Sequence, residues 1–349
     1  TIQMDMLLVI NNIAVQLLLI NLSVNAQHQV AYMEMESQVF LLQENVKYYD
    51  IRKVIFKRKF RIYFSKMPQP WQKLSFINKH PRDEHIKFDE PTHTYYINGS
   101  SSGVISCTKF IHEFFPHFDP DVTIKKMMKS KNWASSVWYG KSADEIKKAW
   151  NDSGKEASAS GTAMHLAIEQ FLHGSPEQID PTNYGTVEWK YFMNFWNDVK
   201  DDLVPYRSEW EVWMKEFLLC GSIDMVFYSK KKNGYVIYDW KRSKEIKTDN
   251  QFATGFGPVE HLPDTNYWHY TLQLNIYKYF LENYYDLKIV DLCLVILHPN
   301  NKNYRLIRLN ILDDEVKEML HCRKRALDMK VNKAIVLPIK ECAFIEEDS

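Results

Sequence analysis

An acid and a base interrupt a strand-like stretch near the middle of the chain. In YVIYDWKRSKEI, residues 235–246, four apolar or aromatic residues are followed by Asp239 and Lys241. Side chains of a strand alternate between its two faces, so Asp239 and Lys241 are expected on one face and Trp240 on the other. A carboxylate and an ammonium group in this position form either an ion pair at a strand end or a metal ligand and its catalytic partner.

A second carboxylate occurs in the apolar stretch GSIDMVFY, residues 221–228. Burial of an unpaired Asp224 would be costly or would raise its pKa. Two such acids on consecutive strands repel each other unless a cation lies between them. Oxygen ligands favour a hard divalent cation, Mg²⁺ or Mn²⁺, and Lys241 beside it would stabilise charge that develops on a phosphate. The alternative is a structural salt bridge from Asp224 to Lys215 or Arg207.

A histidine and a glutamate could complete this site from a helix. The stretch SASGTAMHLAIEQFLHG, residues 158–174, has apolar residues at helical spacing and carries His165 and Glu169 four positions apart, on one helix face. We expect this helix to be separate from an earlier one that starts at the capping-box pair Ser142 and Glu145. The alternatives are a satisfied core histidine and an ordinary surface contact along the helix.

The spacing of the two strands limits how their acids can meet. A two-residue turn at Asn233-Gly234 would leave Asp224 about 13 Å along the sheet from Asp239, too far for one cation. We therefore expect the turn to be centred near Lys231 and Lys232, or the strands to splay or bulge.

The remaining patterns predict an α/β protein with a central mixed sheet flanked by helices. Amphipathic helices are expected over 267–285 and after residue 312, and a hairpin is expected around Asn98-Gly99. Strand-like stretches occupy residues 208–219, 221–228, 235–241, 287–298 and 303–312. The order of helix, three strands, helix and strand is typical of a mixed sheet.

Bulk composition excludes little. The chain has 349 residues, and its 44 basic and 44 acidic residues balance, so net charge does not argue for or against a polyanionic partner. Five cysteines without a CxxC pair indicate a reduced, intracellular protein that lacks a zinc ribbon and is not secreted.

The N-terminal part of the chain carries none of these groups. Residues 7–26 are apolar enough to suggest a signal peptide or membrane helix, but polar residues interrupt them and no basic segment precedes them. A packed helix is therefore the preferred interpretation, and no membrane association is expected. We expect an N-terminal helical and hairpin extension, with boundaries at 1–66 for the extension, 67–335 for the main domain and 336–349 for a C-terminal tail.

Four motifs in this order resemble those of the PD-(D/E)xK nuclease superfamily. They are GTAMHLAIE, GSID, DWK and QLNIY, and they are most similar to the RecB-like branch, which includes the mitochondrial genome maintenance exonuclease and related viral nucleases. The resemblance covers roughly residues 85–330, with the catalytic core at about 155–312. A proline that usually precedes the first aspartate of the family is Ile223 here.

The resemblance implies a restriction-endonuclease-like core and a role for each matched residue. His165, Asp224 and Asp239 would bind Mg²⁺ or Mn²⁺, while Lys241 and Glu169 would act with the two aspartates in catalysis. An iron–sulfur cluster, which some relatives carry, is not expected, because only one cysteine lies upstream of the core.

Further residues of the resemblance point to DNA as the partner. Gln273 and Tyr277 match the QxxxY motif, which contacts DNA near the cut, and Arg242 and Lys244 follow the catalytic strand where a phosphodiester must lie. The expected activity is that of a metal-dependent exonuclease on single-stranded DNA or DNA ends, in replication, repair or recombination. The compartment would be the nucleus, the mitochondrion or a viral replication site. The alternatives are a structure-specific endonuclease and a non-catalytic nucleic-acid-binding module.

Overall fold

The structure is a computed structural model that describes residues 73–333, with side chains up to residue 329. The expected boundaries at 66 and 335 and the apolar segment 7–26 lie outside the described residues. Between residues 73 and 333, no helix is both long and apolar enough to cross a membrane.

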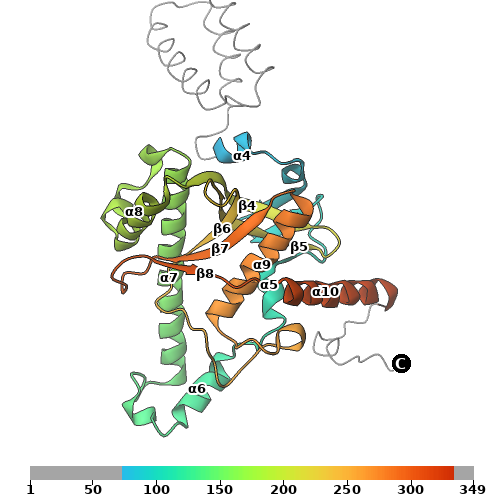
Figure 1. Ribbon diagram of the computed structural model, residues 1–349. Coiled ribbons are helices and arrows are strands. Elements are labelled where there is room, and N and C mark those ends of the chain that lie inside the picture. Colours follow the sequence, from blue (N-terminus) through green and yellow to red (C-terminus); the bar gives the residue numbers. More distant parts are fainter. Residues whose placement is uncertain (1–72, 334–349) are drawn as a thin grey trace, which may run out of the picture. The chain divides into compact units, whose positions relative to one another are not determined.

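A six-stranded mixed sheet lies at the centre (Figure 1). Its strands are β3 (Ile105–Ser106), β4 (Leu203–Met214), β5 (Leu219–Ser229), β6 (Gly234–Lys241), β7 (Ile289–Ile296) and β8 (Arg305–Arg308). β5 pairs antiparallel with β4 and β6 and parallel with β3, while β7 runs parallel to β6 and antiparallel to β8.

Helices cover both faces of this sheet, as Figure 1 shows. One buried cluster packs three helices against the sheet, namely α5 (Cys107–His112), α9 (Asn266–Tyr284) and α10 (Asp313–Lys333). A second buried cluster packs α7 (Ala143–Leu172) and α8 (Val187–Val199) against the opposite face. The expected α/β architecture, a mixed sheet flanked by helices, is therefore confirmed. The four cysteines among the described residues are buried and not paired in disulfides.

The α7 region corrects one prediction. Ser142 caps the helix with the expected capping box to Glu145, and Gly174 follows its end with a left-handed φ of 75°. Between these points the chain is one helix of 30 residues, where two were expected. An uninterrupted helix keeps every backbone group in its own hydrogen-bond ladder, whereas a break near residue 158 would leave orphaned donors and acceptors.

A small upstream sheet corrects the predicted hairpin. The turn at Asn98-Gly99 does form, with an isolated bridge between Ile97 and Ser100. The two paired strands are, however, β1 (Ile86–Asp89) and β2 (Thr94–Ile97), which meet across residues 90–93. The chain after Ser100 turns again at once and so provides no second strand for the predicted hairpin. Shorter helices complete the described elements before α7, namely α4 (Lys73–Ile77), α6 (Pro120–Met128) and the 3-10 helices η2 (Pro81–His85) and η3 (Trp133–Ser135).

Candidate active site

The β5–β6 hairpin brings Asp224 and Asp239 to the same level of the sheet. Ser229 pairs with Gly234, so the connection consists of residues 230–233 and not of Asn233-Gly234. This is the register in which the two acids meet, and the prediction of a turn centred near Lys231 and Lys232 is confirmed.

The two strands separate at the acids themselves. Met225 and Tyr238 are the last residues paired in the register. Beyond this pair, the backbone N–H of Trp240 donates to the side chain of Asp224, at 2.9 Å from Oδ2. A carboxylate oxygen thus takes the place of the backbone carbonyl that would accept this bond in a continuous ladder. On this side of β5, β3 pairs only with the first two residues of the strand, so residues 221–224 have no strand partner there. The site therefore lies where the ladder opens.

Asp239 and Lys241 share one face, as strand alternation predicts. Lys241 Nζ lies 2.7 Å from Asp239 Oδ2, while Trp240 packs into the cluster on the α7 side. Asp239 is 3% exposed, so the ion pair at the strand end forms but is buried. This ion pair is the contact that Oδ2 makes, and no further donor among the described residues reaches it. Lys241 Nζ also lies 4.7 Å from the centre of the Tyr270 ring.

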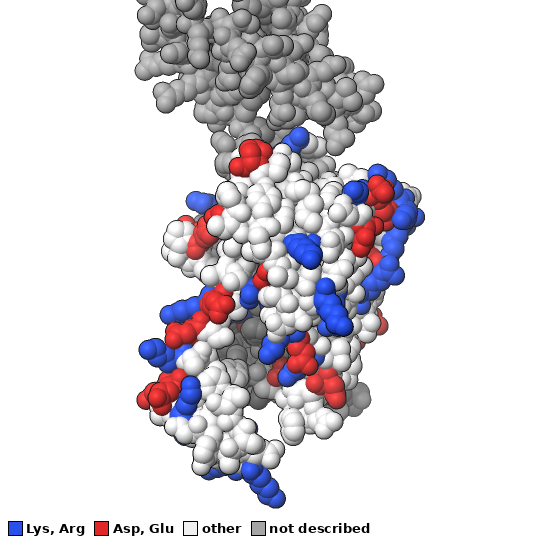
Figure 2. Space-filling model, turned by 90° about the vertical axis from the view of Figure 1, so that its left-hand side faces the viewer, with Lys and Arg blue, Asp and Glu red and all other residues white. Residues whose placement is uncertain are grey.

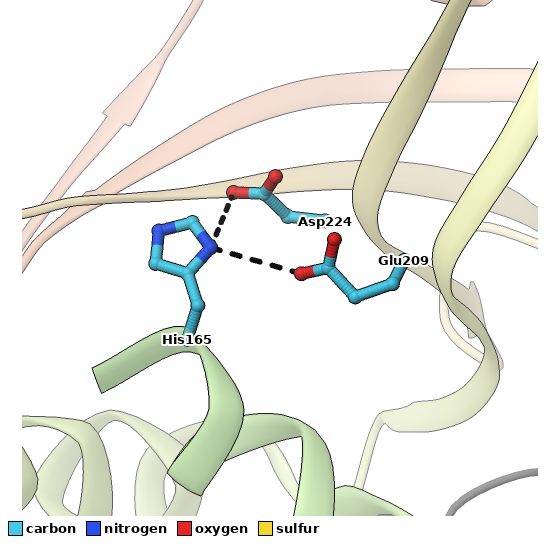
Figure 3. Close-up of side chains that lie close together, drawn as sticks. All are labelled: His165, Glu209 and Asp224. Atoms are coloured by element: carbon cyan, nitrogen blue, oxygen red, sulfur yellow. Dashed lines mark ion pairs between the residues drawn. The ribbon is translucent and has the colours of Figure 1, made fainter. Parts of the chain in front are cut away.

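His165 points from α7 toward two carboxylates (Figure 3). Its Nδ1 lies 3.6 Å from Asp224 Oδ2 and 3.7 Å from Glu209 Oε1. Its Nε2 lies 2.9 Å from the carbonyl oxygen of Trp240. A carbonyl can only accept, so Nε2 carries the proton that it donates, and in the neutral ring this leaves the Nδ1 lone pair facing the carboxylates. This is the arrangement in which a histidine binds a metal ion with one nitrogen and is oriented through the other.

Three residues offer ligand atoms close enough for one cation. One atom each from His165, Glu209 and Asp224 lies within 4.8 Å of the others. This spacing suits ligands around a single divalent ion. Asp239, predicted as a ligand, lies outside this tight group and is held by Lys241 instead. Metal binding by His165, Asp224 and Asp239 stays a prediction, and the geometry adds Glu209 to it.

Glu209 was missed at the level of sequence. It comes from β4, whose register against β5 pairs Ser208 with Met225 and Trp210 with Ile223, so that Glu209 faces Asp224. In the sequence, SEWEVW alternates acids with apolar residues, a pattern typical of a strand with one solvated face. Only the left-handed backbone at Glu209, with φ of 41°, distinguishes it, and that appears only in the structure.

Three carboxyl groups of the site, those of Asp224, Asp239 and Glu169, have raised pKa values. Burial, the largest cause, raises the pKa of Asp224. Burial and the neighbouring Asp224 charge raise the pKa of Asp239 to about 6, although Lys241 opposes this. Burial and the charge of Glu209 likewise raise the pKa of Glu169 to about 7. Several negative charges are thus held together without enough positive charge to balance them.

The two basic groups of the site also hold their protons more tightly than in water. Burial lowers the pKa of His165, but the charges of Asp224 and Glu209 outweigh it and raise this pKa to about 9. Burial also opposes the charge of Lys241, yet Asp239 and Asp224 raise its pKa overall. The site therefore attracts positive charge, which a proton or a metal ion can supply.

The alternative salt bridge for Asp224 is wrong. Arg207 binds Asp83 at 2.7 Å, and no ion pair within residues 73–329 joins Asp224 to Lys215 or Arg207.

The QxxxY pair has an evident structural role. Gln273 Nε2 donates to the hydroxyl of Tyr277 at 3.1 Å, and Tyr277 is 3% exposed. A side chain at Gly221 would come within 2.7 Å of the Tyr277 ring, so this ring fills the space beside the opened ladder of β5. Gln273 is partly exposed. Contact of the pair with DNA stays a prediction, and only Gln273 offers accessible surface for it.

The two predicted DNA-binding residues after β6, Arg242 and Lys244, differ in their surroundings. Arg242 forms a 2.7 Å ion pair with Glu188 of α8, and both side chains are mostly buried. Lys244 is exposed. Figure 2 shows basic and acidic residues interspersed over the face that it presents, so a broad single-sign surface does not mark a path to the site there. DNA contact by Arg242 and Lys244 stays a prediction.

Comparison with known proteins adds little beyond the fold class. No family model matches the sequence, and no curated protein matches it. Among solved structures, a candidate exonuclease from Eubacterium rectale is similar with a TM-score of 0.32 and 14% identity, over 51% of this chain and 69% of that one. Similarity at this level does not carry an activity to the chain, so the functional argument rests on the site.

Proposed function

We propose that this protein is a metal-dependent DNA nuclease that hydrolyses phosphodiester bonds. One observation carries the proposal. At the point where β5 and β6 separate, Asp224 and Asp239 converge with Lys241 from the sheet and with His165 from α7. Buried acids with raised pKa values beside a lysine and an oriented histidine are expected at a catalytic site and are costly anywhere else.

The residues fit a hard divalent cation. Carboxylates dominate the donor set, and one imidazole nitrogen is turned toward them by the Trp240 carbonyl. Mg²⁺ and Mn²⁺ are bound by such oxygen-rich sets, and Mn²⁺ accepts a histidine readily. When bound, the ion would neutralise phosphate charge and lower the pKa of a water molecule. Its charge would also offset the repulsion between Asp224 and Asp239 and so lower their pKa values.

The chain's own groups divide the remaining tasks. Lys241, held 2.7 Å from Asp239, would stabilise the charge that develops on the phosphate. Glu169, with a pKa near 7, can hold or release a proton at neutral pH beside the site. Glu209 would share the cation with Asp224 and His165, and Tyr270 borders the ammonium group of Lys241.

The proposed substrate is single-stranded DNA or a DNA end, cut as by an exonuclease. The motif resemblance supports this, together with the exposed Lys244 and the partly exposed Gln273 near the site. Phosphate contacts of this kind give affinity without sequence specificity. A structure-specific endonuclease is the second candidate within the same chemistry. A non-catalytic binding module is disfavoured, because such a module has no need for Asp224, Asp239 and Lys241 together.

The test is cleavage of an end-labelled single-stranded oligonucleotide with Mg²⁺ or Mn²⁺. We expect cleavage that EDTA abolishes and that Asp239→Asn abolishes without loss of DNA binding. Asp291→Asn is the matched control, because Asp291 is an ion-paired acid on the neighbouring strand β7, away from the site. Activity that survives both EDTA and Asp239→Asn contradicts the proposal.

A circular single-stranded substrate separates the two candidate activities. An exonuclease leaves the circle intact and degrades the linear form, whereas an endonuclease linearises the circle. Single-nucleotide or short products from the labelled linear strand would support the exonuclease, and internal cuts at a junction or flap would support the alternative.

A further inference from the structure

Glu209 adopts a backbone conformation that a strand residue normally avoids. Its φ of 41° lies in the left-handed region, although its neighbours on both sides pair with β5. Non-glycine residues persist in this region only where the surrounding structure holds them there, and such residues concentrate at functional sites. The conformation turns the Glu209 carboxylate toward His165 and Asp224, where it reaches 3.7 Å from the imidazole.

Asp83, which lies outside the sheet, binds Arg207 and Trp210 on either side of Glu209. Arg207 Nη1 lies 2.7 Å from Asp83 Oδ2, and the indole Nε1 of Trp210 donates to Asp83 Oδ1 at 2.9 Å. The Arg207 guanidinium also stacks over the Trp210 ring at 4.4 Å. Asp83 is itself fixed, because the backbone N–H of His80 donates to Oδ2 at 2.9 Å. Both carboxylate oxygens of Asp83 thus hold β4 on either side of Glu209.

Ser208, the residue directly before Glu209, is held by a side chain from α7. His173 lies two helical turns after His165 on α7, and its Nε2 hydrogen-bonds the hydroxyl of Ser208. His173 is 4% exposed, and burial, together with the charge of Arg207, lowers its pKa to about 4. The ring is therefore neutral at physiological pH. Side chains from other segments thus anchor residues 207, 208 and 210, while the Glu209 carboxylate itself accepts from Ser222 Oγ at 3.3 Å and faces His165.

We propose that Asp83 and His173 are positioning residues that hold Glu209 in its left-handed conformation and so aim its carboxylate at the cation site. This inference rests on the proposed metal-dependent function and adds to it a control of metal affinity by two residues that do not touch the metal. Asp83 lies on the 3-10 helix η2 and His173 at the end of α7, so the site is completed only when these two segments dock on β4.

The experiment measures Mn²⁺ affinity of the full chain by calorimetry and combines variants in a double-mutant cycle. Partners that orient metal ligands typically change metal affinity about 10–100-fold, so Asp83→Asn and Glu209→Gln should each weaken Mn²⁺ binding by roughly that range. If Asp83 acts through Glu209, Asp83→Asn should have little further effect in the Glu209→Gln background. Additive losses would show that Asp83 affects the fold in general and would overturn the inference.

His173 provides a second, milder test. His173→Leu keeps the volume but removes the bond to Ser208, and should weaken Mn²⁺ binding. His173→Gln can place an amide nitrogen near the position of Nε2 and should restore binding. Equal affinities for the two variants would overturn the role of His173, and this pair answers the question even where Asp83→Asn does not fold.

Arg323→Gln controls for general destabilisation of the β4–β5 hairpin, which carries Glu209. Arg323 is buried and donates to the carbonyl oxygens of Phe217 and Gly103 near the opposite end of β4 and β5. The Arg323→Gln substitution should lower thermal stability and leave Mn²⁺ affinity unchanged. A wild-type chain that binds no Mn²⁺ would refute the proposed metal-dependent function. A wild-type chain that binds Mn²⁺ only as tightly as Asp83→Asn and His173→Leu do would refute the positioning role alone.

Discussion

Two largely buried aspartates in this protein contact a base at the same distance but in different environments. Asp83 lies 2.7 Å from Arg207, and Asp239 lies 2.7 Å from Lys241. Asp83 accepts from three donors, the guanidinium of Arg207, the indole of Trp210 and the backbone of His80. Asp239 Oδ2 has Lys241 as its one partner among the described residues, and burial and Asp224 raise the pKa of Asp239 to about 6.

The difference separates a structural carboxylate from a candidate functional one. A buried charge that is fully hydrogen-bonded stabilises the fold only as long as both partners remain. A buried carboxylate that has one charged partner and another carboxylate beside it is costly, and it persists where a ligand or a reaction uses it. By this criterion Asp83 holds β4 in place, and Asp239 is available for chemistry.

The largest expected effect is on Asp239. Asp239→Asn should reduce the cleavage rate by more than about 10³-fold, since it removes a charge that the reacting phosphate and cation would need. The free energy of unfolding without metal should fall less than in Asp83→Asn, because Asp224 remains near Lys241 to balance part of its charge. Rates from end-labelled DNA and thermal unfolding of the same preparation check both parts. A folded variant with undiminished cleavage would place Asp239 with Asp83 as a structural residue.

Removal of Lys241 should have the next largest effect. Lys241→Ala should lower turnover at saturating Mg²⁺ by about 10²–10³-fold, while metal and single-stranded DNA still bind. Arg242→Ala, whose side chain pairs with Glu188, should change stability or binding more than turnover. If Lys241→Ala only weakens DNA affinity and leaves saturated turnover unchanged, the lysine is a phosphate contact and not part of the chemistry.

Asp83 should show the opposite pattern from Asp239. Asp83→Asn leaves Arg207 buried without its charge partner and should lower the free energy of unfolding by about 3 kcal/mol, the lower end for a broken buried pair because Asp83 keeps some exposure to solvent. Denaturant titration of the metal-free protein measures this. An Asp83→Asn variant as stable as the wild type would remove the contrast on which the comparison depends.

Glu209 combines features of both aspartates: its backbone conformation should lower the stability of the fold, and its carboxylate should contribute to metal binding. A left-handed non-glycine residue costs about 1–2 kcal/mol, which glycine avoids. Glu209→Gly should therefore be more stable than Glu209→Ala by about 1 kcal/mol, after allowance for the greater flexibility of glycine in the unfolded chain. Both variants should lose Mn²⁺ affinity. Thermal unfolding of the two variants side by side decides, and greater stability of the alanine variant would show that the backbone there is not strained.

The smallest effect is a pH dependence of stability. The pKa of Glu169 rises from an ordinary value of 4.5 to about 7 in the folded protein. The folded state then binds a proton more tightly than the unfolded state, so the stability that this group contributes is full below about pH 4.5 and is lost as pH rises toward 7. Metal-free wild type should lose thermal stability over this window, and Glu169→Gln should lose less. Identical dependence of thermal stability on pH in the two proteins would show that Glu169 is not the group with the raised pKa.

Local sequence was sufficient to predict the class of fold and which acidic, basic and histidine side chains of β5, β6 and α7 lie close together. Strand alternation places Asp239 and Lys241 together, and helical spacing places His165 and Glu169 on one face, because these periodicities are properties of the local backbone. The need to relieve repulsion between Asp224 and Asp239 also predicted the correct position of the turn between their strands. Each of these inferences uses residues that lie close together in the chain or in consecutive strands.

The role of Glu209, and of the residues that hold it, became evident only in the folded structure. The pairing of β4 with β5 contains a register shift between Pro205 and Arg207, and without that shift Glu209 would not face Asp224. Its anchor Asp83 is 124 residues away from Arg207 along the chain. Local patterns specify which faces are apolar, but not the register of one strand against another or which distant polar group will dock there. Those depend on contacts that form only when the whole chain has folded.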